Sequence, residues 1–138
     1  MNAAKTLEIA LSASAIAQLI IATLNLLLVR VMRWQDEVQK MPLLVREVFH
    51  VHGFFVSVTL AIFSTLTLRF ASDVARAANP LCVWLAASIG IFWAMRAVMQ
   101  WTYYSSIHWR GDRARTCVHW ALTIIYGGFS VTYLAAVF

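Results

Sequence analysis

The sequence predicts an all-α integral membrane protein, a single domain in which four transmembrane helices form an up-down bundle. Of its 138 residues, 62% are apolar and only 12% are charged, against roughly 45–50% and about 25% in soluble domains. A folded chain of about 150 residues buries only ~70% of its surface, so lipid must cover much of this apolar excess. The apolar residues also fall into four runs, each near the ~20 residues that a membrane-spanning helix needs.

The four runs are expected to span the membrane at approximately 9–29, 48–68, 81–101 and 117–138. Each is uninterrupted, whereas the strands of a membrane barrel alternate and are about half as long. A helix also satisfies its own backbone amides in lipid. The first run exceeds the ~7–15 apolar residues of a signal peptide, which predicts a retained span. Pro42 and Pro80 precede the second and third spans, and Asn79 is expected to cap the third.

The connectors are expected at 30–47, 69–80 and 102–116, and "RWQDEVQKMP" in the first is predicted to form a short amphipathic helix on the membrane surface. Seven of the eleven basic residues lie in the first and third connectors: Arg30, Arg33, Lys40, Arg46, Arg110, Arg113 and Arg115. The positive-inside rule then predicts that connectors 30–47 and 102–116 are cytoplasmic and that both termini are outside. The expected location is the bacterial inner (plasma) membrane.

Other sequence features bear on partners and ancestry. Tryptophans and tyrosines gather on the same side, as an interfacial belt does: Trp34, Trp101, Tyr103, Tyr104, Trp109 and Trp120. The basic residues do not form a solvated patch with interleaved aromatics, so lipid and not nucleic acid is the expected partner. The segment "RVMRW" at 30–34 is similar to "RAVMQW" at 96–101. With the two Arg-x-x-x-His pairs that follow, this similarity suggests a duplicated helical hairpin.

Each predicted span carries a polar stripe at helical spacing, and the stripes are expected to turn toward one another. Their members are Ser14, Gln18 and Asn25; Glu47, His50, Ser57 and Ser64; Arg96, Gln100 and Tyr103; and His119, Thr123, Tyr126, Ser130 and Tyr133. Ser, Thr, Gln and Asn commonly bond across membrane helices without further function, and Gly127 and Gly128 are expected to allow close helix packing. Tyr126 and Tyr133 are expected to be packing residues.

Polar and titratable residues of all four predicted spans are expected to lie at one depth in the membrane. With ~1.5 Å of rise per residue, Asn25, His50, Gln100 and His119 are expected at similar depths near the cytoplasmic boundary, with Glu47 and Tyr103 one turn further out. Arg96 lies deeper, where a charge costs at least ~2.5 kcal/mol and therefore needs a partner.

Two cofactor hypotheses follow from this level. In the first, His50 and His119 supply two axial ligands to haem b, and Arg46 and Arg115, one turn toward water, bind its propionates. The other polar residues of the level, Arg96, Gln100, Tyr103 and Asn25, would line that site. In the second, Glu47, His50 and His119 bind a single Zn or Fe ion. Haem or an iron ion would imply a redox or electron-transfer role.

Two hypotheses without a cofactor stay open beside these. The protein could be a non-catalytic accessory or assembly subunit of a larger membrane complex, or one half of a homodimer. Gln100, Tyr103 or Asn25 would then satisfy the histidines. It could also be a small transporter or proton path along the polar stripes, although no span is broken at its midplane as transporter spans often are. No nucleophile–base pair, phosphate-binding glycine loop or thiol pair is present.

Overall fold

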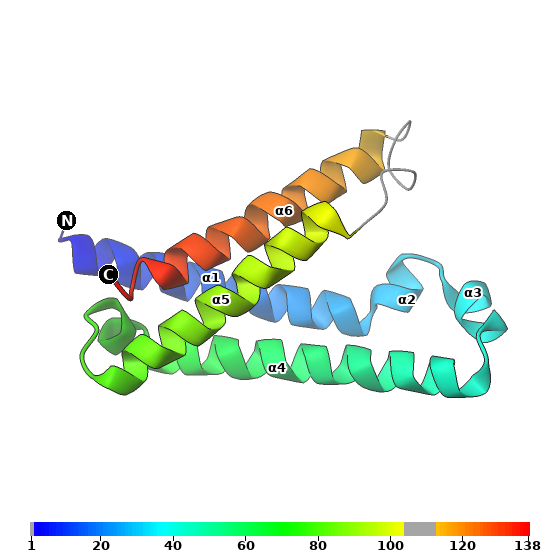
Figure 1. The fold of residues 1–138 in the computed structure, drawn as a ribbon, viewed down its shortest axis with the longest axis horizontal. Coiled ribbons are helices and arrows are strands. Elements are labelled where there is room, and N and C mark those ends of the chain that lie inside the picture. Colours follow the sequence, from blue (N-terminus) through cyan, green and yellow to red (C-terminus); the bar gives the residue numbers. More distant parts are fainter. Residues whose placement is uncertain (1, 104–112) are drawn as a thin grey trace. The chain divides into compact units, whose positions relative to one another are not determined.

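A computed structural model describes residues 2–103 and 113–138, and every regular element in these ranges is a helix. The order is α1 (Ala3–Leu26), α2 (Leu28–Val31), α3 (Gln35–Lys40), α4 (Leu43–Ala75), α5 (Pro80–Thr102) and α6 (Arg113–Leu134) (Figure 1). Most of the connector predicted at 102–116, with Tyr104, Trp109 and Arg110, lies outside the described residues. The prediction of an all-α fold is confirmed for the part of the chain that the structure describes.

Four of these helices, α1, α4, α5 and α6, are long and apolar enough to cross a membrane. Their length and composition support the prediction of an integral membrane protein in contact with lipid. With 33 residues interrupted by a kink at Phe70, α4 is longer than the ~20 residues that a membrane-spanning helix needs. The helix α6 ends at Leu134 and not at Phe138, because Ala136 N–H and Val137 N–H form shorter-range bonds to Tyr133 and Leu134.

The contacts divide the chain into two compact units, each of which is described by itself. One unit is Ser12–Arg69, and the other combines residues 1–11 with Phe70–Phe138. The second boundary coincides with a kink in α4, where Phe70 has φ −119° and ψ 18°. The first unit therefore holds most of α1 and α4 with α2 and α3, and the second holds α5 and α6.

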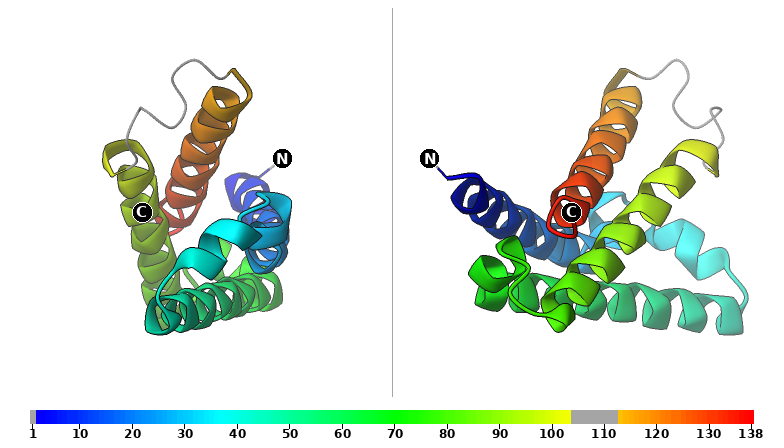
Figure 2. Two further views of the ribbon diagram at one scale, coloured as in Figure 1. Left: turned by 90° about the vertical axis from the view of Figure 1, so that its right-hand side faces the viewer. Right: turned by 60° about the vertical axis from the view of Figure 1, so that its left-hand side comes forward.

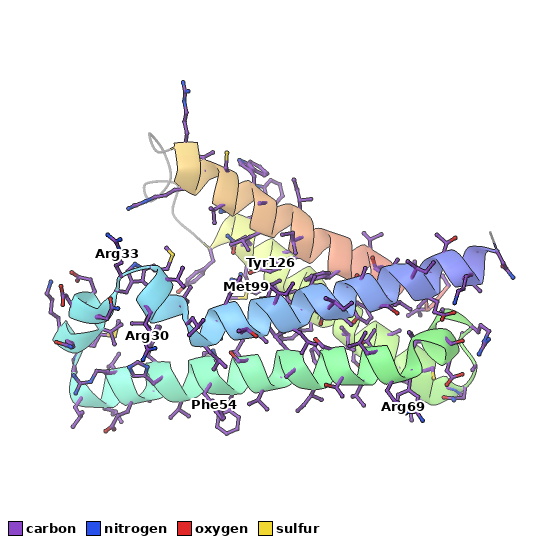
Figure 3. The ribbon with its side chains drawn as sticks, turned by 180° about the vertical axis from the view of Figure 1, so that it is seen from behind. Arg30, Arg33, Phe54, Arg69, Met99 and Tyr126 are labelled. Atoms are coloured by element: carbon purple, nitrogen blue, oxygen red, sulfur yellow. The ribbon has the colours of Figure 1, made fainter. Side chains whose placement is uncertain are left out.

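Within Ser12–Arg69, α1 and α4 form an antiparallel hairpin (Figure 3). The Asn25 Nδ2 amide donates to the carbonyl of Gly53 at 2.8 Å and to Ser57 Oγ at 2.8 Å. The Ser57 hydroxyl donates in turn to the same carbonyl at 3.1 Å, so the three residues form a closed group. On α4, Phe54 points away from α1 and is 55% exposed, as suits a lipid-facing side chain.

In the other unit, α5 and α6 run antiparallel and side by side, as the views of Figures 1 and 2 agree. Asn79 Oδ1 accepts from Cys82 N–H at 3.0 Å just ahead of Pro80, which confirms the predicted cap. Trp93 is 1% exposed and stacks on Tyr126, with ring centroids 5.2 Å apart. These contacts fix which face of α5 meets α6.

The glycine that permits close packing of α5 and α6 is Gly90. A Cβ built there would lie 2.8 Å from Leu134 Cδ2, and the Gly90 carbonyl accepts from Ser130 Oγ at 3.0 Å. The expectation for Gly127 and Gly128 is wrong, because a Cβ at either position meets nothing within 4 Å. Both glycines follow the apolar pattern of α6, but helix register places its close approach elsewhere.

Two helix ends use a left-handed residue that is not glycine. Arg33 has φ 55° and Ala77 has φ 47°. After α2, Trp34 N–H donates to the Val29 carbonyl and Arg33 N–H to that of Arg30, which is the Schellman pattern. Ala78 and Ala77 make the equivalent bonds after α4. The turn at Arg33 leads into α3, so the short helix predicted from "RWQDEVQKMP" is confirmed, while its place on the membrane surface stays a prediction.

Substitution of Gly90 and of Gly128 should distinguish a glycine at the contact between α5 and α6 from one in open space. Gly90→Ala is expected to destabilise the protein by about 1–3 kcal/mol, because its methyl group would overlap Leu134. Gly128→Ala adds a methyl group in open space and is expected to stabilise the helix by about 1 kcal/mol. Unfolding in mixed micelles measures both, and equal effects of the two substitutions would contradict the packing described here.

The turn after α4 offers a second stability test. Ala77→Gly should raise the free energy of unfolding by about 1 kcal/mol, because glycine adopts the left-handed conformation without a Cβ clash. Ala78→Gly is the matched control, since Ala78 has no positive φ, and it should not stabilise. The same unfolding assay applies, and stabilisation by both variants would show that the turn conformation is not the cause.

Candidate functional site

The predicted site residues lie in both units. Arg96, Gln100, Tyr103, Arg115 and His119 belong to the α5–α6 hairpin, whereas Asn25, Arg46, Glu47 and His50 belong to the α1–α4 hairpin. The structure brings Arg96, Gln100 and His119 together within the first of these hairpins. The pairing of His50 with His119 joins the two units and stays a prediction.

A hydrogen-bonded chain runs from α5 to α6. Arg96 Nη1 donates to Gln100 Oε1 at 3.1 Å, and Gln100 Nε2 lies 3.2 Å from His119 Nδ1. Gln100 and His119 are each only 6% exposed, and Arg96 is half-buried. Positions 96 and 100 are one helical turn apart on α5, which places both side chains on the face that meets α6.

The chemistry of arginine sets the tautomer of His119. A guanidinium has donors only, so the Gln100 oxygen must face Arg96 and the Gln100 amino group must face His119. His119 Nδ1 therefore accepts, and the proton of the neutral imidazole resides on Nε2. Through Gln100, the Arg96 guanidinium thus favours one tautomer of the buried His119 imidazole.

Arg96 also contacts an aromatic ring. Its guanidinium carbon lies 4.9 Å from the centroid of Tyr126, which in turn stacks on Trp93. A cation over an aromatic face gains about 0.5–2 kcal/mol, more where water is excluded. Tyr126 is thus part of the Arg96 environment, although its place on the α6 stripe predicted a packing residue only. Its spacing of seven residues from His119 was the signal in the sequence.

The remaining predicted residues of the α5–α6 unit lie at its margin. Tyr103 is 79% exposed at the end of α5, and Arg115 is exposed in the first turn of α6. Thr123, on the His119 stripe, donates to the His119 carbonyl at 2.9 Å. The chain of Arg96, Gln100 and His119 is therefore the buried part of this candidate site, and Tyr103 and Arg115 lie nearer its outer end.

On α4, Glu47 and His50 are exposed and Arg46 is half-buried. Glu47 and His50 are three residues apart, so they share one helix face and could contact one ion together. The His50 ring packs edge-on against Phe49, with centroids 5.7 Å apart. Asn25 bonds to Gly53 and Ser57, which lie further along α4 than His50.

Within residues 2–103 and 113–138, no three His, Cys, Asp or Glu side chains are grouped as a metal site would need. The metal set that the sequence predicts, Glu47, His50 and His119, includes residues of both units. Comparison with models of protein families, with curated proteins and with solved structures found no match to this chain.

A double-mutant cycle tests the buried chain. Gln100→Met and His119→Phe are each expected to destabilise the protein, with a coupling free energy of about 0.6–1.7 kcal/mol, the range for hydrogen bonds between membrane helices. Gln100→Met combined with Val131→Ala is the control and should be additive, since Val131 is exposed and lies about three helical turns from His119 on α6. Additivity of Gln100 with His119 in the unfolding assay would rule out the bond.

Proposed function

We propose that the protein is a four-helix, up-down bundle of the bacterial inner membrane that binds haem b for electron transfer, with His119 and His50 as axial ligands. The observation that carries the proposal is the Arg96–Gln100–His119 chain, which links a membrane-embedded cation to a buried imidazole. A ligating histidine usually donates its other ring N–H to an acceptor, and the Gln100 side chain could become that acceptor for His119 by turning its amide.

The hydrogen bonds of Arg96, Gln100 and His119 favour haem over a bare metal ion on chemical grounds. Ligation through His119 Nε2 requires the ring proton to move to Nδ1, where it needs an acceptor. Gln100 can supply its oxygen only by turning its amide, which withdraws that oxygen from Arg96 and points the amino group toward the guanidinium. Haem supplies propionate groups that can accept from arginine, with Arg46 and Arg115 as further partners, whereas a bare cation supplies none.

A single Zn or Fe ion is the alternative cofactor within the same proposal. Glu47 and His50 share an exposed face of α4 and supply a carboxylate and an imidazole. His119 would complete a two-histidine, one-carboxylate set, which suits either metal. Tyr103, Gln100 and Asn25 would then act as hydrogen-bonding neighbours of the ligands.

We also propose an orientation of the protein in the membrane. We place connectors 30–47 and 102–116 in the cytoplasm and both termini outside, as the distribution of basic residues favours. A duplicated helical hairpin would explain why each half carries an Arg-x-x-x-His pair. The redox partner would approach from the cytoplasmic side, where the exposed residues Glu47 and His50 lie.

An accessory or assembly subunit, of a larger membrane complex or of a homodimer, is the second candidate function. The bond between Gln100 and His119 favours it, because the histidine is satisfied within its own hairpin. Among the described residues, no buried side-chain nitrogen or oxygen lacks a hydrogen-bond partner. Such a protein would need its polar residues for helix pairing only.

Absorption spectra and metal analysis of the purified protein test the two functions. For haem binding we expect a Soret band that disappears in His50→Ala and in His119→Ala. His52→Ala is the matched control, an exposed histidine two residues from His50, and should keep the band. Stoichiometric Zn or Fe without a Soret band would select the single ion.

Arg96→Gln sharpens this test. If propionates replace Gln100 as the partner of Arg96, haem affinity should fall about 10-fold or more, as for other outer-shell partners. Binding of a bare metal ion should not fall. A protein that folds, lacks both haem and metal, and still shows the Gln100–His119 coupling would overturn the cofactor proposal and leave the accessory role.

A further inference from the structure

The segment that joins α1 to α4 has an unusual surface. Its residues Leu27, Val31, Met32 and Trp34 are 42%, 61%, 47% and 40% exposed. Two arginines, Arg30 and Arg33, are interleaved with these apolar side chains and are exposed as well. Exposed apolar and basic side chains over a few consecutive residues are the composition of a membrane-interface segment.

The arginines of this segment differ from its lysine in their partners. Lys40 Nζ pairs with Glu37 Oε1 at 2.8 Å, whereas neither Arg30 nor Arg33 pairs with any acidic side chain in the described ranges. Asp36 and Glu37 lie in the first turn of α3, where they complement the helix dipole. Arg30 and Arg33 therefore keep their guanidinium donors available for an anion from outside the chain.

The backbone at Arg33 strengthens this point. Arg33 closes the Schellman turn after α2 with φ 55°, a conformation that glycine adopts at no steric cost. An arginine at this position forgoes that stability. The turn also separates the two side chains: Arg30 lies on the side of α2 that faces α4, and Arg33 points away from it (Figure 3).

We propose that residues 27–34 bind the phosphate groups of anionic phospholipids, with Arg30 and Arg33 each contacting a different headgroup. Arginine matches phosphate oxygens through paired N–H groups, and each basic side chain near an anionic leaflet contributes to binding. The exposed apolar residues of the same segment make a lipid the occupant, because a soluble phosphate would leave them in water. Trp34 is suited to the boundary between headgroups and acyl chains.

The test measures lipid binding to the detergent-purified protein by native mass spectrometry and by the rise in unfolding temperature. Phosphatidylglycerol should bind and stabilise, whereas phosphatidylcholine and inorganic phosphate at the same concentration should not. Arg30→Gln and Arg33→Gln should each weaken phosphatidylglycerol binding about fivefold, the factor that corresponds to the ~1 kcal/mol expected of one basic side chain. Lys40→Gln is the matched control and should bind phosphatidylglycerol normally, because Lys40 lies in α3, outside residues 27–34, and pairs with Glu37.

Arg33→Gly separates binding from folding. Glycine suits the left-handed turn, so this variant should unfold at a higher temperature than the wild type without lipid, yet gain less from phosphatidylglycerol. Three outcomes would overturn the proposal. They are unchanged phosphatidylglycerol binding in the Arg30→Gln/Arg33→Gln double variant, an equal loss in Lys40→Gln, and full replacement of the lipid effect by inorganic phosphate.

Discussion

The α5–α6 hairpin depends on one amide that serves two partners. The Gln100 oxygen accepts from Arg96, and the Gln100 amino group donates to His119. Because a guanidinium has donors only, the direction of these two hydrogen bonds is fixed. In lipid no water replaces a lost bond, so a buried amide, a cation and an imidazole must be satisfied together. The protonation state of His119, the position of Arg96 and the pairing of two helices are consequently parts of one arrangement.

The same constraint governs the α1–α4 hairpin with neutral groups. Asn25, Ser57 and the Gly53 carbonyl share three hydrogen bonds. No charge is involved, and the group has no titratable member, so its hydrogen bonds serve the pairing of α1 with α4. The polar contact between α5 and α6 differs from this neutral group in its chemistry. Their polar contact includes a permanent cation and a group that can bind a proton or a metal.

The sequence predicts the elements that depend on local chemistry. The long apolar helices, the Asn79 cap and the short helix α3 follow from residue type and spacing, and all three occur. Features that depend on helix register do not follow. The close approach falls at Gly90 instead of Gly127 or Gly128, and Tyr126 contacts Arg96. Periodicity gives the face of a helix, but the facing residue depends on side-chain packing between two helices.

The free energies of hydrogen bonding and of ligand binding show how Gln100 would affect a ligand of His119. The one bond that joins the two helices, from Gln100 to His119, is worth about 0.6–1.7 kcal/mol, whereas a ligand with a dissociation constant of 1 μM binds with about 8 kcal/mol. A satisfied histidine is therefore no energetic barrier to a cofactor. Its effect would be on selectivity, because a group that bound His119 through Nε2 would require Gln100 to turn and to withdraw its oxygen from Arg96. A proton or a bare cation adds a second positive charge beside that arginine, while a ligand that also carries carboxylates compensates for it.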